Sequence, residues 1–201
     1  MEIKLNHIVM NKKKKTSINR HHKHSDYTAS ISVKSENDLF RIIEEIQTIP
    51  FLLILDNIQD PHNLGACLRT AEAAGINAVI APKDRSVGLT QTVIHIASGA
   101  AESIPYVQVT NLARVLRQLK ELGIWLVGTS DKARQSLYEI DLTDPIALVM
   151  GAEGRGLRRL TMKHCDFLVS LPMAGKVECL NVSVATGICL FETVRQRLSK
   201  R

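Results

Sequence analysis

The sequence has 201 residues, of which 45% are hydrophobic and 4% aromatic, and its formal net charge is +6 at pH 7. A chain of this size buries one substantial core, which here must be built mainly from aliphatic side chains. No apolar run reaches the ~20 residues of a membrane span, and the first residues lack the apolar core of a secretion signal. We therefore expect a cytoplasmic protein without a membrane anchor.

The excess positive charge is confined to the start of the chain. Residues 1–35 contain eight Lys or Arg against two acidic residues, whereas the remainder carries eighteen of each sign. This pattern predicts a disordered basic arm over 1–35 that is attracted to polyanions such as RNA. A tail that only improves solubility is the alternative.

The cysteines give no sign of a metal site. Cys67, Cys165, Cys179 and Cys189 form no CxxC motif and show no Cys/His ligand spacing. We expect reduced thiols and no zinc or other metal.

Apolar, strand-like runs alternate with helical segments along the chain. Strands are expected at 51–57, 77–82, 106–110, 124–130, 146–151 and 167–172. Helices are expected at 36–46, 63–75, 89–100 and 111–123, with a last, buried helix within 177–194. Continuous apolar strands separated by helices predict an α/β fold whose mostly parallel sheet is flanked by helices on both faces. Residues 36–50 are expected to form a linker helix, and 51–201 the single folded domain.

Four of these strands end in unusual sequences, "LDNIQDPHNLG", "VGTS", "VMGAEGRG" and "SLPMAGKVECLN". Open α/β sheets bind ligands beyond the carboxyl ends of their strands, and glycine lets the backbone approach a ligand closely. The "GAEGRG" segment has neither the order GxGxxG nor the Lys-Ser/Thr of a Walker loop, which disfavours a dehydrogenase or a nucleoside triphosphate enzyme. Residue patterns alone predict a small-ligand site at this edge, together with a basic arm.

The segments "LDNIQDPHNLGACLRTAEAAG", "LVMGAEGRGL" and "LPMAGKVECLNVSVATGICLFETVRQR" resemble, in this order, the three signature motifs of the SpoU/TrmH branch of the SPOUT methyltransferases. The resemblance implies a C-terminal trefoil knot that binds S-adenosylmethionine, a homodimer that packs near the knot through the final helix, and methylation of an RNA ribose. Details such as "APKDRS" and "VTNLAR" are most similar to members that methylate a guanosine 2′-hydroxyl in 23S ribosomal RNA. Transfer RNA is the alternative substrate, and a noncatalytic, knotted RNA-binding protein is the alternative function.

The resemblance also implies which residues bind the cofactor. They lie in the turns that follow the strands and at the start of the last helix: Thr129, Gly151, Leu171, Met173, Leu180 and Ser183. Ser183 and Thr186 have a second interpretation, in which their hydroxyl groups bond to the backbone of their own helix.

Arg69 is the central catalytic residue that the resemblance implies. It is expected to contact RNA phosphate and to assist removal of the 2′-hydroxyl proton, and stabilisation of the developing alkoxide is the physically easier way to do so. Asn63 is expected to orient the loop of Arg69, Glu153 to anchor Arg69 or the RNA-facing loop, and Asn181 to hold the third motif against the first. An ordinary helix N-cap is the alternative for Asn63, and a solvated helix face is the alternative for Arg69.

Two features depart from the family pattern. Cys179 stands where the family usually has Ser, and a thiol is the weaker hydrogen-bonding group. Ribosomal-RNA members have a folded N-terminal RNA-binding domain where this sequence has the basic arm. The arm is expected either to substitute for that domain by nonspecific attraction or to be a remnant, in which case RNA binding falls to the dimer surface and to an exposed basic cluster formed by Arg155, Arg158 and Arg159.

Overall fold

The computed structural model describes residues 31–152 and 154–200, so most of the basic arm, residues 1–30, lies outside the described residues. In the described part, seven strands form one sheet in the order β3-β2-β1-β6-β4-β7-β5, and every neighbouring pair is parallel. The strands are β1 (Phe51–Asp56), β2 (Ala78–Pro82), β3 (Tyr106–Val109), β4 (Trp125–Thr129), β5 (Gln135–Ser136), β6 (Ile146–Gly151) and β7 (Phe167–Ser170).

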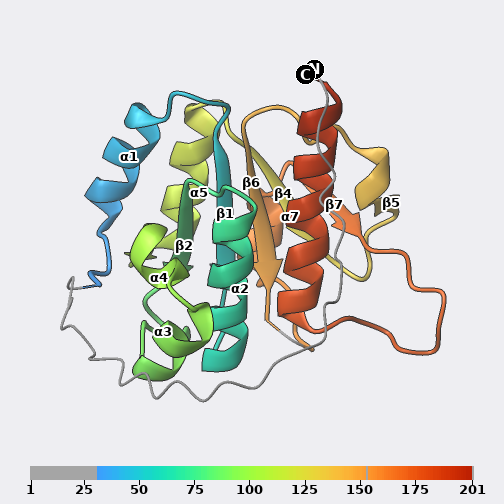
Figure 1. Cartoon of the computed structure of the whole chain (residues 1–201). Helices are drawn as coiled ribbons and strands as arrows, with labels where there is room; N and C mark the ends of the chain where they lie inside the picture. Colours follow the sequence, from blue (N-terminus) through green and yellow to red (C-terminus); the bar gives the residue numbers. More distant parts are fainter. Residues whose placement is uncertain (1–30, 153, 201) are drawn as a thin grey trace, which may run out of the picture.

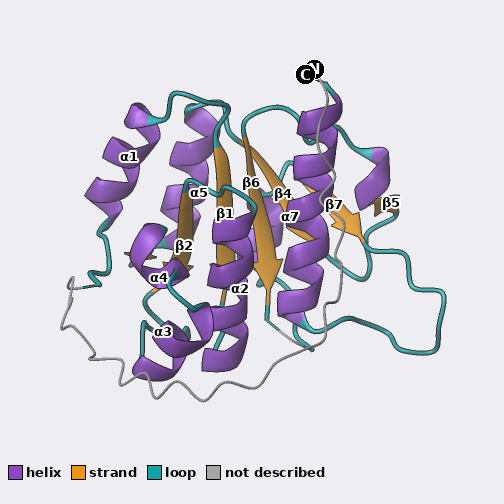
Figure 2. Cartoon of the chain, in the orientation of Figure 1, coloured by secondary structure: helices purple, strands orange, loops and turns teal. Residues whose placement is uncertain are grey.

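Helices cover both faces of this sheet (Figures 1 and 2). One face carries α2 (Pro61–Ala73), α3 (Gln91–Ala97), α4 (Ala100–Ser103) and α7 (Val182–Ser199). The other carries α1 (Glu36–Glu45), α5 (Leu112–Glu121) and α6 (Arg159–His164), and a short 3-10 helix, Leu137–Glu139, follows β5. The α/β class, with its parallel sheet between two helical layers, is confirmed.

Burial on both faces explains the continuous apolar strands. All six residues of β1 are buried, with Leu53 and Leu55 in the cluster beneath α2 and α7, and Leu52 and Ile54 in the cluster beneath α1 and α5. Each such side chain contributes ~1.5–3 kcal/mol when it is removed from water. The sheet is therefore a rigid support for the loops at its edges.

The order of the strands in the sheet brings the four unusual strand ends next to one another. Strands β1, β6, β4 and β7 are consecutive neighbours in the sheet, and they are the four whose carboxyl ends carry the distinctive sequences. Because all pairs are parallel, these ends lie along one edge. The trefoil knot that the family resemblance implies remains a prediction.

The last helix runs between this edge and the opposite one. At its far end the Arg197 guanidinium donates to the carbonyl oxygens of Ile49, Pro50 and Asp144, at 3.1, 3.0 and 2.7 Å, and lies 4.7 Å from the centre of the Phe51 ring. Burial lowers the pKa of Arg197 from its usual value. These contacts fix α7 to the segments that enter β1 and β6.

Helix α1, expected as a linker, packs on the sheet. Its Leu39 is fully buried, and Glu36 forms an ion pair of 2.8 Å with Arg114 of α5. Just before it, Lys34 bonds to β3 through the backbone, since its N–H donates to the Tyr106 carbonyl at 2.8 Å. The helix is therefore part of the folded unit.

Several boundaries differ from the sequence predictions. The expected helix over 89–100 is divided, because Ser98 and Gly99 adopt left-handed φ angles of 54° and 90°. The last helix begins only at Val182 and is not wholly buried, since Val184 and Phe191 are 51% and 48% exposed. The two-residue strand β5 and the six-residue helix α6 are too short for hydrophobic periodicity to reveal. None of the helices in 31–152 and 154–200 is long and apolar enough to cross a membrane.

Candidate active site

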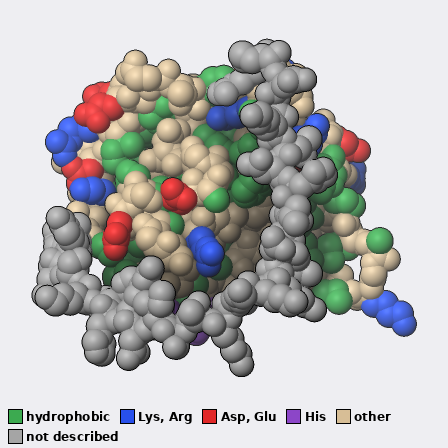
Figure 3. All heavy atoms as spheres, in the orientation of Figure 1, with side chains coloured by type: hydrophobic (Ala, Val, Ile, Leu, Met, Phe, Trp, Pro, Cys, Tyr) green, Lys and Arg blue, Asp and Glu red, His purple; other side chains and the backbone are tan. Residues whose placement is uncertain are grey.

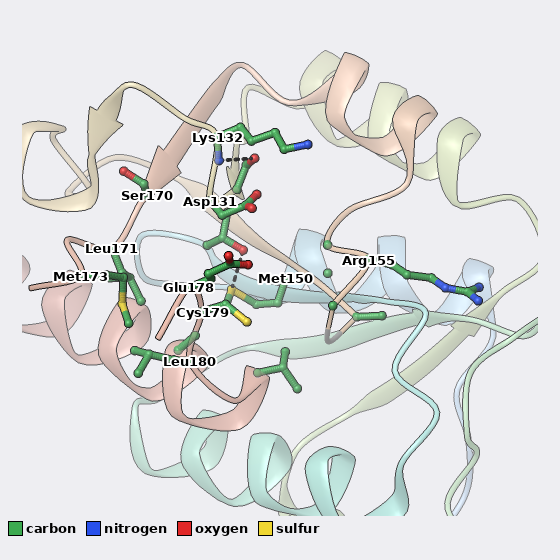
Figure 4. Close-up of a pocket in the computed structure, with 18 of the residues that line it drawn as sticks. Asp131, Lys132, Met150, Arg155, Ser170, Leu171, Met173, Glu178, Cys179 and Leu180 are labelled. Carbon is green, nitrogen blue, oxygen red and sulfur yellow. Dashed lines mark hydrogen bonds between the residues drawn. The ribbon is translucent and has the colours of Figure 1, made fainter. Parts of the chain in front are cut away.

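An open cavity of about 280 Å³ lies beyond the carboxyl ends of β4, β6 and β7. Figure 4 shows that loops from these strands surround it together with the segment that leads into α7. Five of the six residues expected to bind the cofactor line this cavity, namely Thr129, Gly151, Leu171, Met173 and Leu180. The structure therefore brings together residues that are up to 51 positions apart in the sequence.

The sixth, Ser183, does not line the cavity. Its hydroxyl donates to the side-chain oxygen of Asn181 at 2.6 Å, and its backbone N–H donates to the same atom at 2.9 Å. Thr186 is buried and donates to the Val182 carbonyl at 2.7 Å. The alternative interpretation is confirmed for Thr186, whose hydroxyl bonds to the backbone of its own helix, whereas the Ser183 hydroxyl bonds to the Asn181 side chain instead.

The loop after β6, residues 151–157, is closed by its own backbone. The Gly156 N–H donates to the Ala152 carbonyl at 2.8 Å, and Gly154 and Gly156 have positive φ angles of 71° and 63°. A Cβ atom at Gly151 would lie 2.2 Å from the carbonyl carbon of Gly156. Only glycine fits at position 151, which is why the motif begins with it.

A buried charge anchors the end of this loop. Asp56, at the end of β1, is fully buried and forms an ion pair of 2.5 Å with the Arg158 guanidinium, while the Arg158 N–H donates to its other oxygen at 3.2 Å. A buried carboxylate needs such a partner. Arg158 is therefore engaged within the fold and partly buried, whereas Arg155 and Arg159 of the expected basic cluster are exposed.

Two asparagines join the first motif to the third. The Asn181 side-chain amide donates to the side-chain oxygen of Asn63 at 2.9 Å, across the gap between α7 and α2. The Asn181 oxygen accepts from the Ser183 and Val184 N–H groups, so the same residue is the N-cap of α7. The alternative of an N-cap role for Asn63 is wrong, because Asp60 caps α2 and Pro61 is its first residue. The polar start of the last helix therefore holds two motifs together.

A second cavity, of about 310 Å³, adjoins the first. Both are lined by Ala152, Arg155 and Val182, and the second extends to Asn63 and Asn57. Sequence reasoning missed Asn57, whose φ of 72° places it in the left-handed region and whose buried side-chain oxygen has no hydrogen-bond partner. An Asn directly after an apolar strand was the available signal, since Asn tolerates this conformation. The two cavities offer adjacent places for two reactants.

Arg69 lies on α2 with its side chain exposed, and it lines neither cavity. It forms no hydrogen bond or ion pair with any residue in the described part of the chain. Its charge is therefore available to an external anion. Glu153, the other expected charged catalytic residue, lies outside the described residues.

The thiols fall into two groups. Cys179 is exposed and lines the first cavity, whereas burial raises the pKa of Cys165 and of Cys189 to about 12. The acidic neighbours Asp166 and Asp56 raise the pKa of Cys165 further. No group of three or more His, Cys, Asp or Glu side chains able to hold a metal occurs among the described residues.

Comparison with known proteins identifies the class of this fold and site. Residues 50–191 match the model of the SpoU rRNA methylase family, and the chain belongs to this family. The resemblance of the three motifs is thereby confirmed.

Individual relatives agree with this assignment. The chain is 64% identical over 160 residues to the 23S rRNA (guanosine-2′-O-)-methyltransferase RlmB of Ralstonia nicotianae, covering 80% of this chain and 64% of that protein. It is 62% identical over 162 residues to the enzyme of that name from Escherichia coli, covering 81% and 66%. The chain thus spans slightly less than two thirds of the length of these two relatives.

Solved structures show the same architecture. The SpoU methyltransferase AviRb from Streptomyces viridochromogenes, in complex with the cofactor AdoMet, superposes with a TM-score of 0.74 at 30% identity, over 81% of this chain and 65% of that one. The TrmH/SpoU tRNA modifying enzyme of A. aeolicus superposes with a TM-score of 0.70 at 30% identity, over 82% and 85%.

Proposed function

We propose that this protein transfers a methyl group from S-adenosylmethionine to the ribose 2′-hydroxyl of a guanosine in 23S ribosomal RNA. One observation carries the proposal: motif residues from the ends of β4, β6 and β7 converge on a single cavity, and the Asn63–Asn181 hydrogen bond joins this cavity to the first motif. The relatives named for this reaction, at 62% and 64% identity, support the choice of substrate.

The residues around the first cavity suit an adenosine-containing cofactor. Leu171, Met173 and Leu180 supply apolar surface, and the closed loop 151–157 brings backbone groups to the rim. Apolar walls with a few fixed polar groups are typical of cofactor sites. The bound cofactor supplies an electrophilic methyl group on a sulfonium.

The second cavity is the place for the target ribose. It shares Ala152, Arg155 and Val182 with the cofactor cavity, so a hydroxyl group held there adjoins the methyl donor. Asn63 and Asn181 fix the wall between the cavities, which aligns the two reactants and lowers the entropic part of the barrier. These asparagines therefore act as positioning residues.

Arg69 provides the positive charge that the reaction needs. A guanidinium stays protonated, so it stabilises a developing alkoxide or its neighbouring phosphate more readily than it removes a proton. Its exposure and its lack of a partner in the described chain leave it available to RNA. Glu153 stays a candidate for anchoring Arg69 or the RNA-facing loop, and Arg155 and Arg159 for binding phosphates, with Arg158 shared between RNA and Asp56.

A homodimer formed through α7 completes the proposal. Val184, Phe191 and Leu198 are spaced seven residues apart, and all three are exposed, at 51%, 48% and 62%. Seven residues make two helical turns, so these side chains form one apolar stripe. Hydrophobic side chains also lie among charged ones on the face that carries α2 and α7 (Figure 3). Phe191→Glu is expected to convert the dimer into monomers in analytical ultracentrifugation, whereas an unchanged dimer would place the interface elsewhere.

Transfer RNA is the second candidate substrate. The tRNA modifying enzyme of A. aeolicus is covered over 85% of its length, whereas the relatives named for 23S rRNA are covered over 64% and 66%. Both substrates are found in the cytoplasm, where we place the protein.

The test is transfer of a labelled methyl group from S-adenosylmethionine to purified 23S rRNA and to tRNA, side by side. Label at a guanosine 2′-oxygen of 23S rRNA is expected, and label on tRNA alone would favour the second candidate. Absence of label, with cofactor binding intact, would favour a noncatalytic RNA-binding protein.

Arg69→Ala is the matched test of the mechanism. We expect transfer to fall by about 100-fold or more while cofactor affinity changes little, as for loss of one transition-state charge partner. Arg117→Ala is the control, because Arg117 is also an exposed arginine, on α5 at the opposite face of the sheet. Equal loss of transfer and cofactor binding in Arg69→Ala would make Arg69 a structural residue.

A further inference from the structure

The acidic and basic side chains that line the cofactor cavity point in different directions. Four charged residues line it in the described part of the chain, Asp131 and Glu178 with carboxylates, and Lys132 and Arg155 with cationic groups. In Figure 4 the Glu178 carboxylate points into the cavity, toward the region of Met150 and Cys179, whereas the Lys132 and Arg155 side chains extend away from it. The interior of the cavity is therefore more negative than its composition suggests.

Glu178 belongs to the loop that closes the cavity between β7 and α7. It forms no hydrogen bond or ion pair with another described residue, so its charge is not neutralised by the fold. The nearby Lys176 is also exposed but does not line the cavity.

The two forms of the proposed cofactor differ in charge. S-adenosylmethionine carries a sulfonium, an α-ammonium and a carboxylate, and so has one net positive charge. The product, S-adenosylhomocysteine, has lost the methyl group and the sulfonium charge, and so is net neutral. A carboxylate in the cavity attracts the methylated form more strongly than the product.

We infer that Glu178 is a specificity-determining residue that makes the cavity select the cationic methyl donor over its neutral product. This inference rests on the proposed function, because it assumes that S-adenosylmethionine occupies this cavity. Its consequence for turnover is weaker inhibition by the product, which competes with the donor for the same site.

The test is calorimetric titration of the full chain with each form of the cofactor, without RNA. Glu178→Gln keeps the shape of the side chain and removes its charge. We expect it to weaken S-adenosylmethionine binding by about 3- to 10-fold, as for one partly screened charge pair, and to change S-adenosylhomocysteine binding by less than about twofold. Lys176→Gln, which removes the opposite charge from the same loop, is the control and should leave the ratio of the two affinities unchanged.

Ionic strength gives an independent readout of the same charge. The preference of the unmodified chain for S-adenosylmethionine should decrease as salt is raised, and the preference of Glu178→Gln should depend less on salt.

The possible failures are distinguishable. If the unmodified chain binds neither form, the proposed function fails, and this inference fails with it. If it binds both and Glu178→Gln leaves the ratio unchanged, only the inference is overturned. Equal weakening of both forms also overturns it, because Glu178 would then bind the α-ammonium that the two forms share.

Discussion

Two of the loops that line the proposed cofactor cavity, those after β6 and β7, are built in opposite ways. The described residues 151, 152 and 154–157 are constrained by the close approach of Gly151 to Gly156 and by the Ala152–Gly156 hydrogen bond, and the ion pair of buried Asp56 with Arg158 fixes the residue that follows. Residues 171–181 are largely exposed, and a Cβ atom at Gly175 would meet nothing within 4 Å. At the end of this second loop, the Asn181 side chain binds Asn63 and caps α7.

Because of this difference, we expect the two loops to have different roles in ligand binding. The constrained loop presents fixed backbone groups, which cost no reorganisation when a ligand binds. The open loop contributes three chemically different side chains to the cavity, those of Met173, Glu178 and Cys179, and it can adjust around a ligand. Substitutions should therefore have large effects in the first loop and small effects in the second, except at Asn181.

Gly151→Ala should have the largest effect. The added Cβ atom lies 2.2 Å from a backbone carbon, so the loop must move. We expect a loss of about 3 kcal/mol of stability, which lowers the melting temperature by ~6–12 °C, together with loss of cofactor binding. Calorimetric melting and titration measure both. A variant with the original melting temperature and affinity would show that the loop is not constrained as described.

Asn181→Ala should have the next largest effect, about 1–3 kcal/mol, because it removes the N-cap of α7 and the bond to Asn63. Asn181→Ser separates the two roles, since a serine can cap the helix but is too short to bridge to Asn63. In chemical denaturation the serine variant should recover part of the stability, yet its methyl transfer should stay low. Full recovery of transfer would remove the bridge from the mechanism.

The reactivity of the thiols tests the difference between the exposed loop and the buried part of the fold. Cys179, exposed in the open loop, should react quickly with a disulfide reagent at pH 8, while the buried Cys67 and Cys189 and the partly buried Cys165 stay protected. Raising the pH to 10 should not recruit Cys165 or Cys189, because their pKa is raised to about 12. Cys179→Ser is the control that removes the fast reaction. A second fast thiol in the native chain would contradict the assigned burial.

Alkaline pH should lower the stability of the fold, because the thiols of Cys165 and Cys189 ionise more readily in the unfolded chain. These thiols ionise near pH 9 when unfolded and near 12 when folded, so between these values the unfolded chain binds fewer protons. Stability therefore falls as the pH rises above 9 and is unaffected by these groups below it. Denaturation midpoints at pH 8, 9 and 10 measure the decline, and a midpoint that increases over this range would contradict it.

Gly175→Ala should have the smallest effect. Its φ angle is not in the positive region and its surroundings are open, so a methyl group meets no neighbour. We expect a change in stability within about 0.5 kcal/mol and nearly unchanged cofactor affinity. A loss comparable to that of Gly151→Ala would mean that both loops are equally constrained.

The sequence predicts the constrained parts of the molecule better than the open ones. Strand identities, the parallel sheet and the position of Gly151 follow from apolar runs and family motifs, because burial and close backbone contact leave few choices. The sequence places the last helix only within residues 177–194, and the Asn181 cap sets its start at Val182. The N-cap of α2 was missed, because Asp60 and Pro61 begin the helix before Asn63.

Long-range geometry accounts for the remaining differences. Pairing of Arg158 with buried Asp56 depends on a contact across 102 residues, which local patterns do not contain. The unpartnered oxygen of Asn57 and the absence of Ser183 from the cavity likewise depend on how distant segments meet.

Hydrogen exchange with and without S-adenosylmethionine tests the central claim, that these two loops hold the cofactor, most directly. Adding the cofactor should protect residues 171–181 strongly and residues 151–157 weakly, because the latter are already fixed, and it should leave α1 and α5 unchanged. Protection confined to another part of the chain, or no protection at a saturating concentration, would contradict the account.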